Sequence, residues 1–153
     1  MILEPRIQDW PAEAACAHAA QALALRPALR EAYVELHGTL GAGKTTFVRH
    51  LLQALGVIGR VKSPTYAVME PYDLPGLSVW HFDFYRFNDP QEWEDAGFRD
   101  VFASRGLKLA EWPEQAAGLL PQADLRVALD IGAADHRRAT FSALTPRGQA
   151  LLP

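Results

Sequence analysis

The alternation of apolar and polar side chains predicts a strand, a glycine-rich loop and a helix in direct succession. Residues 33–37 alternate as a short strand does, and three glycines follow between Gly38 and Gly43. In the stretch 46–55, the apolar residues recur three and four positions apart, which is the spacing of one face of a helix. Gly56 is a typical residue to end that helix.

Weaker patterns lie on both sides of this unit. An alanine-rich stretch from Pro11 to Leu25 predicts an earlier helix, because proline favours the first helical turn. Downstream, apolar runs at 66–70 and 78–85 flank a turn-forming cluster at 72–76, and this order predicts a β-hairpin. Two short helices are expected after the hairpin, one starting at Pro90 and one over 99–104.

Three more alternating or apolar runs predict strands at 107–110, 125–131 and 138–144. The last two are joined by the loop 132–136, so we expect them to form a terminal antiparallel pair. The predicted fold class is α/β, a mixed sheet flanked by helices. With no repeat or linker in the pattern, residues 1–153 are predicted to form a single domain.

Composition limits the class of protein and the cellular compartment that we expect for this domain. The chain has 153 residues, of which 49% are hydrophobic and 22% charged. A chain of this length buries roughly 70% of the surface that its unfolded form exposes, so it needs no disulfide bonds or bound metal ion to fold. The net charge of −3 gives no overall attraction to nucleic acid. Cys16 has no partner for an internal disulfide, and neither a signal sequence nor a membrane span of about 20 apolar residues is visible. We predict a cytoplasmic protein.

The glycine-rich loop carries the strongest chemical signal. Gly38-Thr-Leu-Gly-Ala-Gly-Lys-Thr45 matches the pattern G-x-x-x-x-G-K-[ST] at every fixed position, between a predicted strand and a predicted helix. In such a loop the backbone N–H groups surround phosphate oxygens, and the helix start adds its positive dipole end. By this pattern we expect Lys44 to reach the β- and γ-phosphates and the Thr45 hydroxyl to ligate Mg²⁺. The loop predicts a nucleotide-phosphate site, and with the strand and helix beside it a P-loop NTPase-like mixed sheet flanked by helices.

Two acids are candidates to complete the metal site. Asp83 ends the apolar run 79–82, and Glu111 follows the short strand 107–110. Either acid fits a metal position at a strand end, and either also fits an ordinary solvated strand end. Asp83 has a further alternative, an ion pair with Arg86. The residues alone leave this choice open.

Thr65 is a further candidate in the segment between the loop helix and the hairpin. Segments at this place sense the γ-phosphate in related architectures, but Ser63-Pro64-Thr65 is also good turn chemistry. His81 is interpreted as a packing residue in preference to a catalytic one, and Trp112 as a core or interface residue. The sequence contains no Asn-Lys-x-Asp motif, which GTPases use to read guanine, and its absence favours ATP. Residues 1–153 are therefore predicted to form a single P-loop ATPase domain.

The motifs together resemble the TsaE family, small P-loop ATPases of bacterial tRNA threonylcarbamoyladenosine biosynthesis. Four stretches carry the resemblance in the family's order and spacing: Gly38–Thr46, Val61-Lys-Ser-Pro-Thr-Tyr66, His81-Phe-Asp-Phe-Tyr-Arg86 and Glu111-Trp-Pro-Glu114. The resemblance implies that Lys44, Thr65, Asp83 and Glu111 take part in ATP hydrolysis, with Thr65 acting as a switch. It implies Mg²⁺ bound by Thr45 and Glu111, with Asp83 nearby, and ATP bound by Gly41, Ala42, Gly43, Lys44, Thr45 and Thr46.

The resemblance also implies partners. Members of the family work with TsaD and TsaB, which transfer threonylcarbamoyl to adenosine in tRNAs that read codons beginning with A. This chain would then supply slow ATP turnover to the assembly and meet tRNA only through the complex, with no role for a membrane. Two alternatives compete with this reading: a small-molecule kinase, and a non-catalytic ATP-binding adaptor. A phosphorylated product would favour the kinase, and function that survives loss of Glu111 would favour the adaptor.

Overall fold

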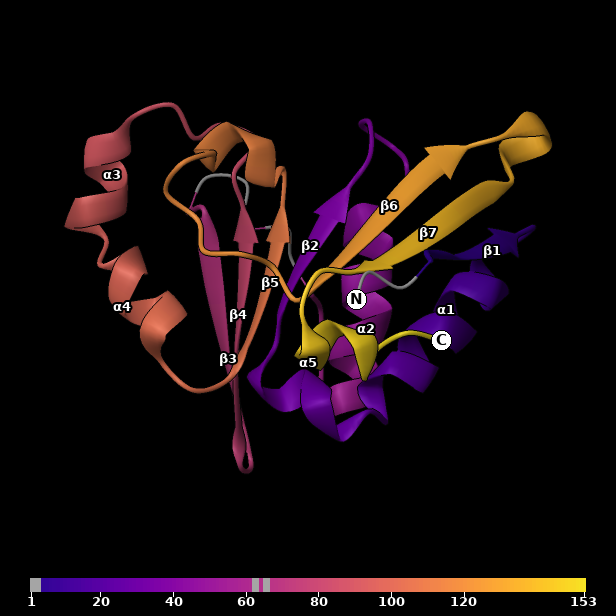
Figure 1. The fold of residues 1–153 in the computed structure, drawn as a ribbon, viewed down its shortest axis with the longest axis horizontal. Helices are drawn as coiled ribbons and strands as arrows, with labels where there is room; N and C mark the ends of the chain where they lie inside the picture. Colours follow the sequence, from indigo (N-terminus) through magenta and orange to yellow (C-terminus); the bar gives the residue numbers. More distant parts are fainter. Residues whose placement is uncertain (1–3, 62–63, 65–66) are drawn as a thin grey trace.

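The centre of the molecule is one mixed sheet of seven strands (Figure 1). The structure is a computed structural model, and it describes residues 4–61, 64 and 67–153. The strand order is β1-β7-β6-β2-β5-β4-β3. The strands are β1 (Arg6–Trp10), β2 (Tyr33–His37), β3 (Met69–Leu74), β4 (Leu77–Asp83), β5 (Leu107–Glu111), β6 (Leu125–Ile131) and β7 (Arg137–Ala143).

The four central strands are parallel, so their carboxyl ends share one edge of the sheet. β2 pairs with β5 on one side and with β6 on the other, and β5 pairs with β4. Their arrowheads point the same way in Figure 1. β3, β7 and β1 are antiparallel to their neighbours and extend the sheet at both sides. Side chains that follow β2, β4 and β5 are therefore brought together at one edge.

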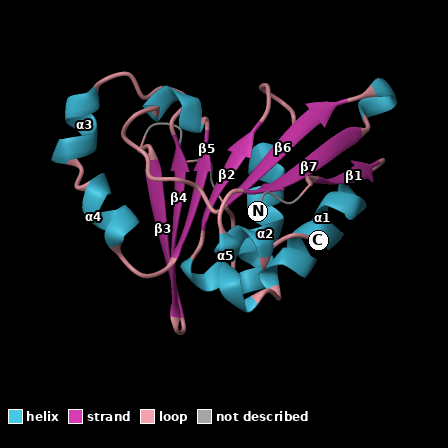
Figure 2. Cartoon of the chain, viewed as in Figure 1, coloured by secondary structure: helices cyan, strands magenta, loops and turns pink. Residues whose placement is uncertain are grey.

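Helices cover both faces of this sheet (Figure 2). The α-helices are α1 (Glu13–Ala24), α2 (Lys44–Leu55), α3 (Pro90–Asp95), α4 (Phe98–Ala103) and α5 (Pro146–Gln149), and the short 3-10 helices are η1 (Pro27–Glu31), η2 (Pro113–Ala116) and η3 (Ala133–Asp135). α1 and α2 pack side by side on one face, and α3 and α4 lie over the other. In the described part of the chain, no helix has the length and apolar character needed to cross a membrane.

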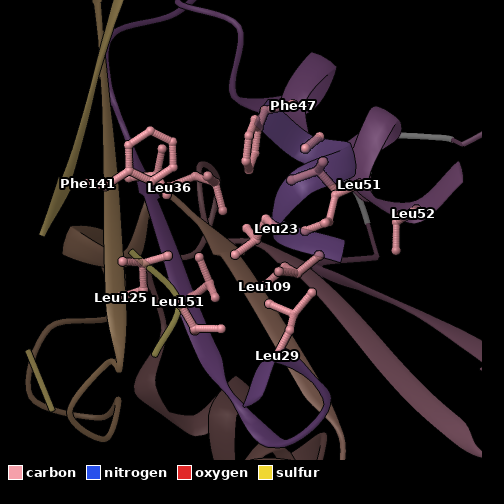
Figure 3. Packing of buried hydrophobic residues seen from close by; sticks show 14 of the residues in the cluster. Leu23, Leu29, Leu36, Phe47, Leu51, Leu52, Leu109, Leu125, Phe141 and Leu151 are labelled. Carbon is pink, nitrogen blue, oxygen red and sulfur yellow. The ribbon is translucent and has the colours of Figure 1, made fainter. Parts of the chain in front are cut away.

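The face beneath α1 and α2 is filled mainly by aliphatic side chains (Figure 3). Phe47, Leu51 and Leu52 of α2 are fully buried, and they meet Leu36 of β2 and Leu109 of β5. Burying each such side chain contributes about 1.5–3 kcal/mol. This packing fixes α2 relative to β2, and so it fixes the loop that joins them.

The opposite face is aromatic. Phe82 stacks on Phe84 with ring centroids 5.4 Å apart, and Phe98 of α4 meets Phe82 edge-on at 5.2 Å. Trp93 of α3 packs edge-on against the Phe98 ring at 5.7 Å. Because Phe82 and Phe84 flank Asp83 in the sequence, these rings anchor the end of β4 that carries this acid.

The predicted fold class is confirmed, including the terminal antiparallel pair β6–β7. The strand 33–37 and the strand 125–131 have the predicted bounds, and α2 ends at Gly56 as expected. The hairpin prediction is wrong in detail, because 72–74 belong to β3 and only Pro75 and Gly76 turn. Strand β1 was not predicted. It is an edge strand whose stability comes from pairing with β7, 127 or more residues away, and no local pattern encodes that partner.

Candidate functional site

The glycine-rich loop, Gly38–Thr45, has a backbone shape that only glycine adopts readily. Gly38 has φ +146°, and a Cβ there would lie 2.6 Å from the carbonyl oxygen of Leu129. Gly43 has φ +106° and caps the start of α2, which begins at Lys44. The loop therefore connects the carboxyl end of β2 to the amino end of α2, where backbone N–H groups lack helical partners and favour an anion.

Lys44 lies under the loop and is almost fully buried. Its Nζ donates hydrogen bonds to the carbonyl oxygens of Gly38 and Thr39, and it lies 3.6 Å from the ring centroid of Trp112. Burial lowers the pKa of Lys44, whereas the nearby carboxylate of Glu111 favours its charged form. The ammonium group is thus held at the loop by carbonyl oxygens and an aromatic face, interactions that phosphate oxygens can replace.

The two candidate acids are neighbours across the sheet. Asp83 and Glu111 are paired residues at the ends of the parallel strands β4 and β5, and both are buried. The hydroxyl of Thr45 donates a 2.8 Å hydrogen bond to Oε1 of Glu111, across 66 residues of sequence. Asp83 accepts a 3.0 Å hydrogen bond from the backbone N–H of Tyr85. Loop and strand ends therefore place a hydroxyl and two carboxyl groups in one place.

His81 holds the other oxygen of Glu111. Its Nε2 lies 2.6 Å from Glu111 Oε2, and the His81 side chain is fully buried. The interpretation of His81 from the sequence as a packing residue did not predict this contact. The available signal was strand alternation, which places His81 and Asp83 on the same face of β4.

A cavity of about 360 Å³ joins these groups. Its lining residues come from the loop, the ends of β4 and β5, and the segments that follow them: Leu40, Gly41, Ala42, Gly43, Lys44, Thr45, Thr46, Asp83, Tyr85, Arg86, Glu111 and Trp112. All six residues predicted to bind ATP, 41–46, and both candidate acids thus line one cavity. Thr65 lies outside the described residues. Trp112, interpreted from the sequence as a core or interface residue, has φ +56° and places its ring over the ammonium group of Lys44.

A second cavity of about 190 Å³ adjoins the first. The two share Gly41, Ala42, Gly43 and Thr46, and the second is completed by Trp10, Ala12, Glu13, Cys16, Asp135 and Arg137. The guanidinium of Arg137 donates to the carbonyl oxygens of Gly41 at 3.2 Å and Ala42 at 3.1 Å. Burial raises the pKa of the Cys16 thiol to about 11. Arg137 therefore ties the β6–β7 hairpin to the glycine-rich loop.

The fold, together with the residues at the carboxyl edge of the sheet, defines an α/β protein with a glycine-rich loop between a central strand and a helix. A family model described as "Threonylcarbamoyl adenosine biosynthesis protein TsaE" matches residues 10–139. The chain therefore belongs to the TsaE family, as its motifs predicted.

Known proteins agree with this assignment. The chain is 50% identical over 97 residues to a tRNA threonylcarbamoyladenosine biosynthesis protein TsaE of Haemophilus influenzae, a match that covers 63% of this chain and 61% of that protein. It is 37% identical over 116 residues to a protein of the same description from Bacillus subtilis, covering 76% and 72% of the two chains. The crystal structure of YdiB from Bacillus subtilis is similar over 99% of this chain and 93% of YdiB, with a TM-score of 0.78 and 27% identity.

Proposed function

We propose that this protein binds ATP with Mg²⁺, hydrolyses it slowly, and acts with TsaD and TsaB in threonylcarbamoyl modification of adenosine. The tRNAs concerned read codons that begin with A, and they would meet this chain through the complex. The observation that carries the proposal is the 2.8 Å contact between Thr45 and Glu111, beside Lys44 and the glycine-rich loop. Membership in the TsaE family supports the biosynthetic role.

The cavity suits a triphosphate. The backbone N–H groups of the loop, the amino end of α2 and Lys44 supply positive charge on one side. The adjoining cavity shares the loop residues Gly41–Gly43 and leads toward Trp10, so it is where we place the nucleoside. In this arrangement Arg137 steadies the loop through hydrogen bonds to two of its backbone carbonyl groups.

The residues present fit Mg²⁺. The Thr45 hydroxyl and the Glu111 carboxylate are hard oxygen donors, the type this ion prefers. Among the described residues, no group of three or more His, Cys, Asp or Glu side chains could hold a metal ion alone. Such a partial site is typical of Mg²⁺, which is commonly bound by one or two carboxylates together with substrate phosphates and water. We assign Thr45 and Glu111 as the ligands, with Asp83 beside them.

Hydrolysis would proceed by positioning and charge neutralisation. Lys44 and the loop N–H groups bind the phosphate oxygens, while buried Asp83 orients the water that attacks the γ-phosphorus. Mg²⁺, when bound, supplies further positive charge to the β- and γ-phosphates. Thr65 is proposed to sense the γ-phosphate. Within the described cavity wall the arginines are limited to Arg86, so we expect partners to stimulate turnover.

Binding is tested first, by calorimetry with ATP and Mg²⁺. Lys44→Ala should weaken ATP binding by about 100-fold or more, because it removes charge-assisted hydrogen bonds to phosphate. Lys108→Ala is the matched control: Lys108 is equally buried, bonds the Ser104 carbonyl and lies near the Trp80 ring, but is outside the cavity. Its ATP affinity should equal that of the wild type.

Turnover is tested by single-turnover hydrolysis with and without TsaD and TsaB. The expected result is slow hydrolysis alone and faster hydrolysis with both partners. No heat of binding in either condition would overturn the proposal as a whole. Equal rates in the two conditions would contradict the partner-stimulated turnover, and transfer of phosphate to a nucleoside or small alcohol would identify a kinase instead.

A further inference from the structure

Glu111 is held at both oxygens by groups from different parts of the chain. Oε1 accepts the Thr45 hydroxyl at 2.8 Å, and Oε2 lies 2.6 Å from Nε2 of His81. The side chains of His81 and Glu111 are 0% and 3% exposed, so water does not compete for this second contact. A buried, short hydrogen bond to a carboxylate restricts its rotation more than an exposed one does.

The position of the shared proton follows from the partners of the ring. A carboxylate only accepts hydrogen bonds, so the proton between His81 and Glu111 belongs to Nε2. The other ring nitrogen, Nδ1, is buried and has no hydrogen-bond partner in the part of the chain that the structure describes. An N–H group left unpaired there would be a buried donor without an acceptor, which is strongly unfavourable. Nδ1 therefore carries the lone pair, and His81 is the Nε2–H tautomer.

We propose that His81 is a positioning residue for the cation site. By binding Oε2, the ring turns Oε1 of Glu111 toward Thr45 and the cavity, where a cation bound with nucleotide would lie. His81 itself lines no part of the cavity and touches neither nucleotide nor cation in this arrangement. This inference rests on the proposed function, since it assigns Glu111 and Thr45 as Mg²⁺ ligands. Residues that orient metal ligands in this way typically change metal affinity 10–100-fold when replaced.

Two substitutions distinguish the effect of losing the hydrogen bond from the effect of a smaller side chain. In His81→Gln the side-chain amide nitrogen takes the place of Nε2, so the bond to Glu111 is kept. In His81→Asn the amide nitrogen takes the place of Nδ1, so the bond to Glu111 is lost. His37→Asn is a matched control, because His37 bonds the carboxylate of Glu35 rather than that of Glu111.

The measurement is the Mg²⁺ concentration that gives half of the magnesium-dependent gain in ATP affinity, from calorimetric titrations at several Mg²⁺ concentrations. We expect His81→Asn to raise this concentration about tenfold, and His81→Gln and His37→Asn to leave it within about threefold of wild type. With EDTA present, all variants should bind ATP equally, which shows that the loop is intact. Equal Mg²⁺ requirements for His81→Asn and His81→Gln would overturn the role of His81.

A second measurement uses the wild-type protein, so it decides even if His81→Asn does not fold. The ¹⁵N chemical shifts of the His81 ring should show a protonated Nε2 and an unprotonated Nδ1. The opposite tautomer would overturn the inference. If wild-type protein bound no ATP with Mg²⁺ but showed the Nε2–H tautomer, the proposed function would fail, and the cation role with it, while the His81–Glu111 geometry would stand.

Discussion

Two buried carboxylates in this sheet have similar partners and different surroundings. Glu111, on β5, is bound by a threonine hydroxyl and a histidine at 2.8 and 2.6 Å. Glu35, on β2, is bound by the Tyr33 hydroxyl at 2.9 Å and by His37 at 3.1 Å. The partners of Glu35 come from its own strand, two residues to either side. The partners of Glu111 come from α2 and β4, and only Glu111 lines the cavity.

The difference separates a local structural cluster from a site assembled by the fold. Burial alone would raise the pKa of Glu35, but the hydrogen bonds from His37 and Tyr33 outweigh it and lower the pKa overall. Burial raises the pKa of Tyr33, and the neighbouring carboxylate of Glu35 raises it further. These contacts stabilise the strand without facing a ligand. Glu111 has the same kind of contacts at the edge of the sheet where β2 leads into the glycine-rich loop, so its chemistry is available to a ligand.

The largest expected effect is on hydrolysis. Glu111→Gln should lower the single-turnover rate of ATP hydrolysis on the order of 100-fold, the typical effect of removing one preorganised electrostatic contact. Glu35→Gln removes the same charge from a similarly buried position outside the cavity, and its rate should stay within about twofold of wild type. A similar loss of hydrolysis rate in both variants would show that removing either buried carboxylate acts through folding rather than through the nucleotide site.

A smaller effect should appear in stability and its dependence on pH. Because the folded-state pKa of Glu35 is lowered, its ionised form stabilises the fold above the unfolded pKa of about 4.5, and this contribution disappears as the pH falls through the folded value. Glu35→Gln should therefore reduce the free energy of unfolding by about 1.5 kcal/mol near pH 5.5. Urea unfolding at pH values from 5.5 to 3 should show the difference from wild type shrinking. A constant difference would contradict the role of the charge.

The smallest effects on stability come from the two hydroxyl groups. Tyr33→Phe and Thr45→Val each remove one hydrogen bond to a buried carboxylate, so each should lower the free energy of unfolding by about 1 kcal/mol without ligand. Only Thr45→Val should also abolish the gain in ATP affinity that Mg²⁺ produces, measured by calorimetry. If Tyr33→Phe abolished this gain as well, Glu35 would belong to the same functional unit as Glu111.

Much of the fold was predictable because its signals are local. Strand 33–37, the glycine-rich loop and the helix ending at Gly56 follow from patterns within 25 residues, and the structure places them as predicted. The hairpin turn was misplaced because turn-forming residues at 72–74 also fit an edge strand, where Pro71 needs no ladder hydrogen bond. β1 was missed because its stability depends on β7, at the far end of the chain.

The sequence by itself determined the loop, its lysine and the two candidate acids, since a phosphate-binding loop is encoded within eight consecutive residues. Only the tertiary structure decided that Glu111 meets Thr45 and that His81, read as packing, holds the other oxygen of this acid. The reason is that these contacts span 66 and 30 residues. They depend on the order and register of parallel strands, which is fixed by the packing of the whole sheet.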